Sequence, residues 1–261
     1  MIAKLACILL SFTIMAHADG LASQKHTTQG IKQFKSAYQS WSNSGFWNAG
    51  KEFHKATEIS PELSVNYYWL GTTRFHRMLL LQGKDDKKSK RAAITEMASA
   101  LDALETTIKL DPENAEAHAM IGTIFGMKIN DSLLRAIRFG PSVQEHHKLA
   151  LKHGLKNPRV QYLLGAGLLH TAENETDTTE ALKSLLLAEK LFESEIEKAK
   201  EVGAPWNQPR WGYDACLAFA GHAFENLGKN RKAADYYQKA LLIQPINHKA
   251  KAGLKRLATT P

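Results

Sequence analysis

The sequence predicts an all-α fold, a solenoid of about five helical hairpins followed by a capping helix near the C-terminus. Small and apolar residues recur at spacings of three and four, which places them on one face of a helix. A glycine follows ten residues after Pro61 and again after Pro112, and such internal repetition is typical of stacked hairpins. No alternating apolar run indicates a strand. An irregular all-α bundle is the alternative.

The clearest repeat is the stretch GHAFENLGKNRKAADYYQKALLIQP, residues 221–245. With the residues just before it, it carries two trios at spacings of four and three: Leu217, Gly221 and Phe224, then Ala233, Tyr237 and Ala240. A Gly-Lys-Asn turn at 228–230 separates the two helices, and Pro245 ends the second. The small residues are expected where the helices approach closely, so a larger side chain at Gly221 would push them apart.

Similar patterns occur upstream, and together they predict the bounds of five hairpins. They lie at about residues 30–60, 62–111, 113–157, 159–203 and 209–244, and a polar-faced terminal helix follows at 247–258. Second-helix trios of the same kind are Ala49, Phe53 and Ala56, then Ala100, Leu104 and Thr107, then Ala181, Leu185 and Ala188. Three irregular segments are expected as connections: the charged loop 83–91, the link 128–142, and the turn TAENETDTT. The first two are candidate lids.

The signature positions of these hairpins resemble the tetratricopeptide repeat (TPR). Stretches between about residues 110 and 245 are also similar to bacterial exported TPR proteins, which share a Gly-Met-Lys-Ile, a Gly-Pro, an Asn-Pro-Arg and a Trp-Gly. The resemblance implies a solenoid whose first helices line a concave face, and repeats of this kind mostly bind peptides or partner proteins there. It implies no settled activity.

The first residues have the features of a secretory signal peptide. Lys4 supplies a basic start, residues 5–15 are apolar, and Ala16-His17-Ala18 is a small-x-small cleavage pattern. The prediction is therefore a signal peptide at 1–18, cleaved between Ala18 and Asp19, and a repeat domain at 19–261. A buried N-terminal helix is the alternative. The apolar run is too short for a permanent membrane span, so the mature chain is expected to be periplasmic or secreted, with no transmembrane segment.

Charge and cysteine content restrict the function classes. The net charge is +8, and loss of the signal peptide removes only Lys4 from the basic residues. Because the excess is scattered and not interleaved with aromatic residues on one face, nucleic-acid binding is not expected. The mature chain would keep a single cysteine, Cys216, which rules out an internal disulfide. Its apolar neighbours predict a buried, unreactive thiol.

The candidate binding residues are those on the expected exposed turns of the first helices. They combine aromatic, hydroxyl, carboxylate and imidazole groups, which suits a mixed polar and apolar ligand. They are Tyr68, Thr72, His76, Glu116, Thr123, Tyr162, His170, His222, Glu225 and Asn226. Relative to TPR clamps that grip a C-terminal carboxylate, this set lacks the dense lysines and asparagines. The alternative is that these side chains pack on neighbouring repeats.

No metal, cofactor or catalytic site is expected. His222 and Glu225 are three apart on one helix, but ligands on successive repeats lie too far apart to converge on one ion. The cluster at 145–153, with three histidines, lacks the H-E-x-x-H spacing and is interpreted as a solvated face. No G-x-S-x-G, phosphate loop or zinc-type cysteine pair is present. The chain is therefore not expected to be an enzyme.

Two functions from different classes are favoured, and a hydrolytic or metal-dependent enzyme is the third and weakest alternative. The first is an exported scaffold that binds a partner protein or peptide on its concave face within an envelope complex. The second is a soluble periplasmic carrier or receptor for a small ligand, for example one that delivers it to a membrane transporter. A scaffold predicts an exposed apolar patch, and a carrier predicts an enclosed pocket lined by the aromatic residues named above.

Overall fold

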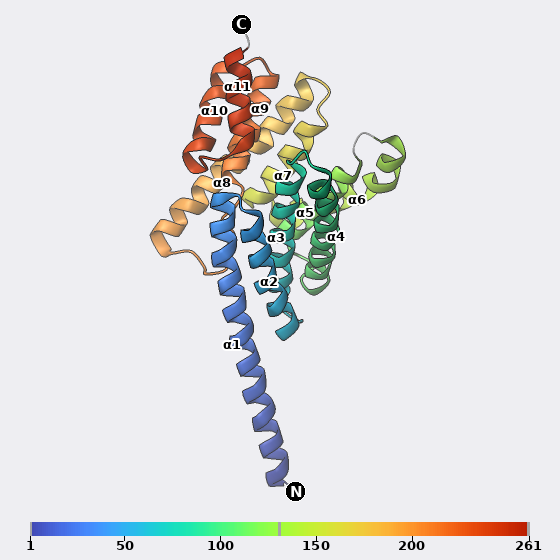
Figure 1. Cartoon of the computed structure of the whole chain (residues 1–261), viewed down its shortest axis with the longest axis vertical. Coiled ribbons are helices and arrows are strands. Elements are labelled where there is room, and N and C mark those ends of the chain that lie inside the picture. The colour runs from blue at the N-terminus through green and yellow to red at the C-terminus, as the bar shows by residue number, and fades with distance from the viewer. Residues whose placement is uncertain (1, 130–131, 260–261) are drawn as a thin grey trace. The chain divides into compact units, whose positions relative to one another are not determined.

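A computed structural model describes residues 2–129 and 132–259, with side chains from residue 20 onward. Within that part the chain is helical, and no strand occurs. The chain forms two compact units, Met1–Pro112 and Glu113–Pro261, and each has its own hydrophobic interior. Figure 1 shows the helices coloured along the chain, with unit 1 running from blue into green.

Unit 1 consists of two helical hairpins. Its helices are α1 (Ile2–Ser40), α2 (Asn43–Ile59), α3 (Ser64–Gln82) and α4 (Lys87–Leu110). The α1–α2 turn is only two residues long, and the Ser42 hydroxyl accepts a hydrogen bond from the Gly45 backbone amide, which caps the start of α2. Phe34, Phe46, Phe53 and Trp69 are packed together in the interior. The first two expected hairpins are therefore confirmed.

Unit 2 holds three hairpins and the terminal helix. Its helices are α5 (Ala115–Ile129), α6 (Leu133–Gly154), α7 (Pro158–His170), α8 (Glu175–Val202), α9 (Tyr213–Asn226), α10 (Asn230–Ile243) and α11 (His248–Thr259). Helix α10 ends at Ile243, before Pro245, as predicted. The expected order of five hairpins and one terminal helix is therefore correct.

Close helix contacts at glycine recur in all five hairpins. A methyl group added at Gly221 would lie 2.8 Å from the Cδ1 atom of Tyr237 on α10, inside van der Waals contact. The other four pairs are Gly30 with Phe53, Gly71 with Leu104, Gly122 with His147, and Gly165 with Leu185. The predicted second-helix trios are buried as well. Small residues therefore do mark the points of closest approach.

The three expected irregular segments are mostly helical. Helix α4 starts at Lys87, because the Asp86 carboxylate accepts from the Ser89 amide at 2.8 Å, so the loop is only 83–86. Asn174 likewise caps α8 and shortens the predicted turn there. Most of the 128–142 link belongs to α5 and α6, while residues 130 and 131 lie outside the described part. The expectation of long loops at these places was wrong, because side-chain caps start helices inside them.

The N-terminal segment begins α1. Residues 1–18, where a signal peptide is predicted, have side chains outside the described part, so cleavage and export stay predictions. Among the described residues, no helix is both long and apolar enough to span a bilayer.

Cys216 is buried on α9, as predicted. Its Sγ donates to the carbonyl oxygen of Leu185 on α8 at 3.3 Å. Burial raises the pKa of this thiol well above its ordinary range, and the nearby carboxylates Glu189 and Asp214 add to the rise. The thiol is therefore protonated and unreactive while the contact holds.

Candidate functional site

The predicted binding residues of unit 1 are buried. Tyr68, Thr72 and His76 on α3 are at most 6% exposed, so they do not form the exposed face that was expected. The His76 ring packs against aromatic rings of α1 and α2, and its Nδ1 pairs with the Thr72 carbonyl oxygen at 2.8 Å. Desolvation lowers the pKa of His76 to about 4, so its imidazole is neutral near pH 7. Contact between a partner and any of these three residues stays a prediction.

Glu116 and Tyr162 of unit 2 are buried too. Glu116 on α5 accepts a hydrogen bond from the Asn157 side-chain amide at 2.8 Å and lies 3.5 Å from the Arg159 guanidinium. The Tyr162 ring packs near Phe219, and burial is the main cause that raises its pKa. Both side chains were expected on an exposed face, and both lie instead in the packed interior of unit 2.

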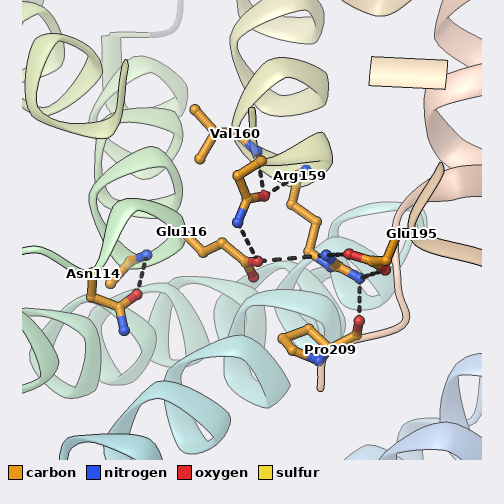
Figure 2. A network of polar contacts seen from close by, with 8 residues as sticks. Asn114, Glu116, Arg159, Val160, Glu195 and Pro209 are labelled. Atoms are coloured by element: carbon orange, nitrogen blue, oxygen red, sulfur yellow. Dashed lines mark hydrogen bonds and ion pairs between the residues drawn. The ribbon is translucent and has the colours of Figure 1, made fainter. Parts of the chain in front are cut away.

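Arg159 is the centre of this buried polar network (Figure 2). Its guanidinium makes two hydrogen bonds to the Glu195 carboxylate, at 2.9 and 2.7 Å, and donates to the Pro209 carbonyl oxygen. Arg159 is 1% exposed and lies beside the rings of Phe192 and Trp211. One cation thus joins carboxylates from α5 and α8 with the segment before α9. This arrangement ties elements of unit 2 together.

Of the predicted residues in the fifth hairpin, Glu225 fastens the terminal helix. The Glu225 carboxylate on α9 accepts two hydrogen bonds from Arg256 of α11, both at 2.8 Å, and one from the Tyr237 hydroxyl at 2.5 Å. The Arg256 hydrogen bonds hold the pKa of Glu225 below its ordinary value. His222 is half-buried, and desolvation lowers the pKa of its imidazole. Glu225 therefore has a structural role that the sequence analysis did not foresee.

Three further predicted residues reach the surface, in different degrees. His170 ends α7 and Asn226 ends α9, and both are exposed. Thr123 is partly exposed, and its hydroxyl donates to the Ala119 carbonyl oxygen at 2.8 Å. These three keep the concave-face hypothesis open for unit 2.

A pair of histidines occupies the third hairpin. The Nδ1 atoms of His118 on α5 and His146 on α6 lie 3.0 Å apart, so they share one hydrogen. Desolvation lowers the pKa of His146, and the nearby His118 lowers it further. Across the described residues, no three His, Cys, Asp or Glu side chains gather in a way that could hold a metal ion.

An open cleft on unit 1 lies along α1 and α2. It is lined by Leu21, Gln24, Lys25, His26, Thr28, Gln29 and Glu52. The His26 Nδ1 and Glu52 Oε2 atoms lie 2.7 Å apart, and this hydrogen bond lowers the pKa of Glu52. None of the predicted binding residues lines this cleft, and it is not the aromatic-lined enclosed pocket that a small-ligand carrier would need.

A tryptophan–arginine cluster on unit 1 was missed by the sequence analysis. Trp47 of α2 is 43% exposed, and the guanidinium groups of Arg74 and Arg77 lie 5.1 and 4.6 Å from its ring centroid. Arg74 donates to both Glu96 carboxylate oxygens at 3.2 Å, and Arg77 also pairs with Glu96. Arg77 is fixed further by the side chain of Asn43 at 2.9 Å.

Two cations on one carboxylate leave this cluster with an excess positive charge beside an exposed indole. The sequence signal was the spacing of Arg74 and Arg77, three apart on one helix. Their partners Trp47 and Glu96 come from two other helices, so only the fold brings the four together.

Comparison with solved structures identifies the fold. TTC0263, a thermophilic TPR protein of Thermus thermophilus, matches with a TM-score of 0.63 at 13% identity, covering 92% of this chain and 100% of that one. MamA matches at 15% identity and TM-score 0.40 over 83% of this chain and 93% of its own. YrrB, described as a TPR protein with an unusual peptide-binding site, matches at 17% identity and TM-score 0.38, over 92% and 99%.

Of these three structures, TTC0263 has a TM-score above 0.5, and its match shows the architecture. No family model and no curated protein matches the chain in sequence. The helix order, the glycine contacts and this match agree, and the chain therefore has a TPR fold.

Proposed function

We propose that this chain is an exported, non-enzymatic TPR scaffold that binds a partner protein or peptide within an envelope complex. The observation that carries the proposal is the Trp47–Arg74–Arg77 cluster on the surface of unit 1. Tryptophan and arginine are the side chains most enriched at the centres of protein interfaces. Here the indole is exposed, and the two guanidinium groups beneath it are held in place by Glu96 and Asn43.

The fixed geometry of the cluster reduces the conformational entropy that is lost when a partner binds. An indole stacked on fixed guanidinium groups has few alternative positions, so less conformational freedom is lost when a partner covers it. The excess positive charge of two arginines on one carboxylate favours a partner with acidic groups beside an apolar side chain. On unit 2, His170, Thr123 and Asn226 remain candidate contacts on the predicted concave face.

A site-specific crosslinking experiment tests the proposal. A photoreactive residue at position 47 should capture a partner in envelope extract, and the same residue at position 94, which is 69% exposed on α4, serves as the control. Trp47→Ala should then weaken binding of the captured partner by about 2 kcal/mol, or roughly thirty-fold, while Ile94→Ala changes it little.

Each outcome has a clear meaning. Capture from position 94 but not from position 47 would overturn the assignment of this surface. If His170→Ala and Asn226→Ala weaken binding instead, the concave-face hypothesis is favoured over the Trp47 cluster. Export is tested separately, by the N-terminal sequence of protein recovered from the expressing cell, which should start at Asp19.

A further inference from the structure

The first two turns of α6 expose an apolar ridge that unit 2 leaves uncovered. Leu133, Leu134 and Ile137 are 77%, 80% and 67% exposed. Single exposed aliphatic residues are common on protein surfaces, but three on adjacent positions of one helix form a contiguous patch. At 100° per residue they span about a third of the helix circumference, so they share one outward face.

The opposite side of the same turns is anchored. The Phe139 ring packs on Phe125 of α5, with ring centroids 5.9 Å apart, and the Lys128 ammonium lies over both rings. Helix α6 is thus held by its inner face, which fixes the outward direction of the apolar ridge.

Positive charge accompanies the ridge. Arg135 and Arg138 are exposed on the same two turns. Arg138 follows Leu134 around the helix, with its guanidinium also 5.1 Å from the Phe139 ring centroid, and Arg135 lies farther from the ridge on the same side. From Ser132 to Gln144 the chain contains no acidic residue. Asp131 and Glu145 border this stretch in the sequence, but the two turns that carry the ridge contain arginines and no acid. An exposed aliphatic face with arginines beside it is typical of helices that lie in the interface of anionic membranes.

We propose that the ridge formed by Leu133, Leu134, Ile137, Arg135 and Arg138 docks unit 2 onto an anionic lipid surface. The aliphatic side chains enter the boundary between headgroups and acyl chains, and the guanidinium groups bind lipid phosphates. An exposed apolar face accompanied by positive charge fits a deformable surface of negative charge. A protein groove would need matching shape, and nothing in the ridge selects one. The contact is reversible, because three side chains provide little buried area.

Vesicle binding tests the proposal. The protein is purified in the N-terminal form in which the expressing cell leaves it, checked by mass, so that all variants share it. It is mixed with phosphatidylcholine vesicles with or without phosphatidylglycerol and sedimented. Binding should need the anionic lipid and should fall with added salt. Replacing Leu133, Leu134 and Ile137 together by Ser should weaken it about tenfold or more.

The matched control is Leu242→Ser on α10, a residue that is 85% exposed in the same unit. It removes apolar surface elsewhere and should leave vesicle binding unchanged. The arginine pair is tested by Arg135→Gln with Arg138→Gln, which should remove most of the salt dependence. Because all five side chains are exposed, the helical content and melting temperature of the variants should stay near those of the parent protein.

A local probe separates the ridge from any other lipid-binding segment. An environment-sensitive dye on Ile137→Cys, in a Cys7→Ser background where Cys216 is buried, should shift to the blue on anionic vesicles. The same dye on Leu242→Cys should not shift. No vesicle binding at low salt, unchanged binding of the serine variant, or a dye that stays in water would each overturn the proposal. So would loss of a protein partner by the serine variant without any lipid effect.

Discussion

The third and fifth hairpins occupy one unit and share one backbone pattern, yet they differ at the same interior position. In the fifth, Gly221 meets the ring of Tyr237, which is fully buried and whose hydroxyl is held by Glu225. In the third, Gly122 meets the imidazole of His147, which is only half-buried. The other three hairpins have Phe53, Leu104 and Leu185 there.

The difference shows how one polar residue changes a repeat. In the fifth hairpin the glycine contact is a tyrosine ring with a fixed hydroxyl, whereas in the third it is an equally close imidazole that is half-desolvated and titratable. The third hairpin also carries the His118–His146 pair and the exposed ridge of α6. Its departures from the pattern therefore gather in one place.

Loss of Arg159 should have the largest effect on unit 2, because this residue connects the third hairpin to the segment before the fifth. Arg159→Met would leave Glu116 and Glu195 without their cation in a largely buried place, at about 3 to 5 kcal/mol of unfolding free energy. Urea unfolding measures it. Lys183→Met, which removes an exposed ion pair with Glu180, should change stability by less than about 0.5 kcal/mol.

Enlarging the two glycines tests the comparison directly. Gly221→Leu should destabilise by about 1 to 3 kcal/mol, because the Tyr237 ring and the Ala233 carbonyl oxygen cannot both move away. Gly122→Leu should be less harmful, since the His147 imidazole can turn toward solvent. Melting curves of both variants decide the matter. Equal losses would mean that the third hairpin is closed as firmly as the fifth.

Acid should weaken the third hairpin through His147. Desolvation lowers the pKa of His147 in the folded state, while the unfolded chain binds a proton near the ordinary value of about 6.5. The unfolded state therefore holds more protons below that pH, and stability falls as the pH decreases through this range.

His147→Leu should reduce the loss of stability at low pH. The change in unfolding free energy should be smaller than the one expected for Gly221→Leu. Unfolding free energies measured in urea at several pH values check it. His222→Leu is a useful companion, since its pKa is lowered in the same direction within the fifth hairpin. If the pH profile of the His147 variant matches that of the parent protein, this imidazole is not the source of the acid sensitivity.

Among these contacts between helices, the smallest effect is expected at α11. The Arg256 side chain is 49% exposed, so its ion pair with Glu225 is screened by water, and Arg256→Gln should destabilise by about 0.5 to 1 kcal/mol. Hydrogen exchange should show faster opening of α11 with little change in α9. Faster exchange throughout α9 would mean that the terminal helix supports the whole fifth hairpin.

The architecture was predictable because the small residues at hairpin contacts recur at regular spacings in the sequence. Ala233, Tyr237 and Ala240 could be assigned from spacing alone, and so could their upstream equivalents. Helix starts were less predictable, because Asp86 and Asn174 act as caps inside segments that look like loops.

The candidate site was harder to predict, because exposure depends on what covers a helix. Tyr68 and His76 have the spacing of surface residues on α3, but aromatic residues from neighbouring helices surround the imidazole. Trp47 and Arg74 come together only through packing of α2 on α3. Such contacts between distant residues leave no periodic mark in one sequence.

Cys216 has a practical consequence for studying the motions of unit 2. Its thiol donates to α8 from α9, so a labelling reagent can reach the sulfur only after the fourth and fifth hairpins separate. The rate of thiol labelling therefore reports the free energy of that separation, provided that closing is faster than the reaction. Labelling of Cys216 thus measures the opening of the contact between α8 and α9 without any engineered probe.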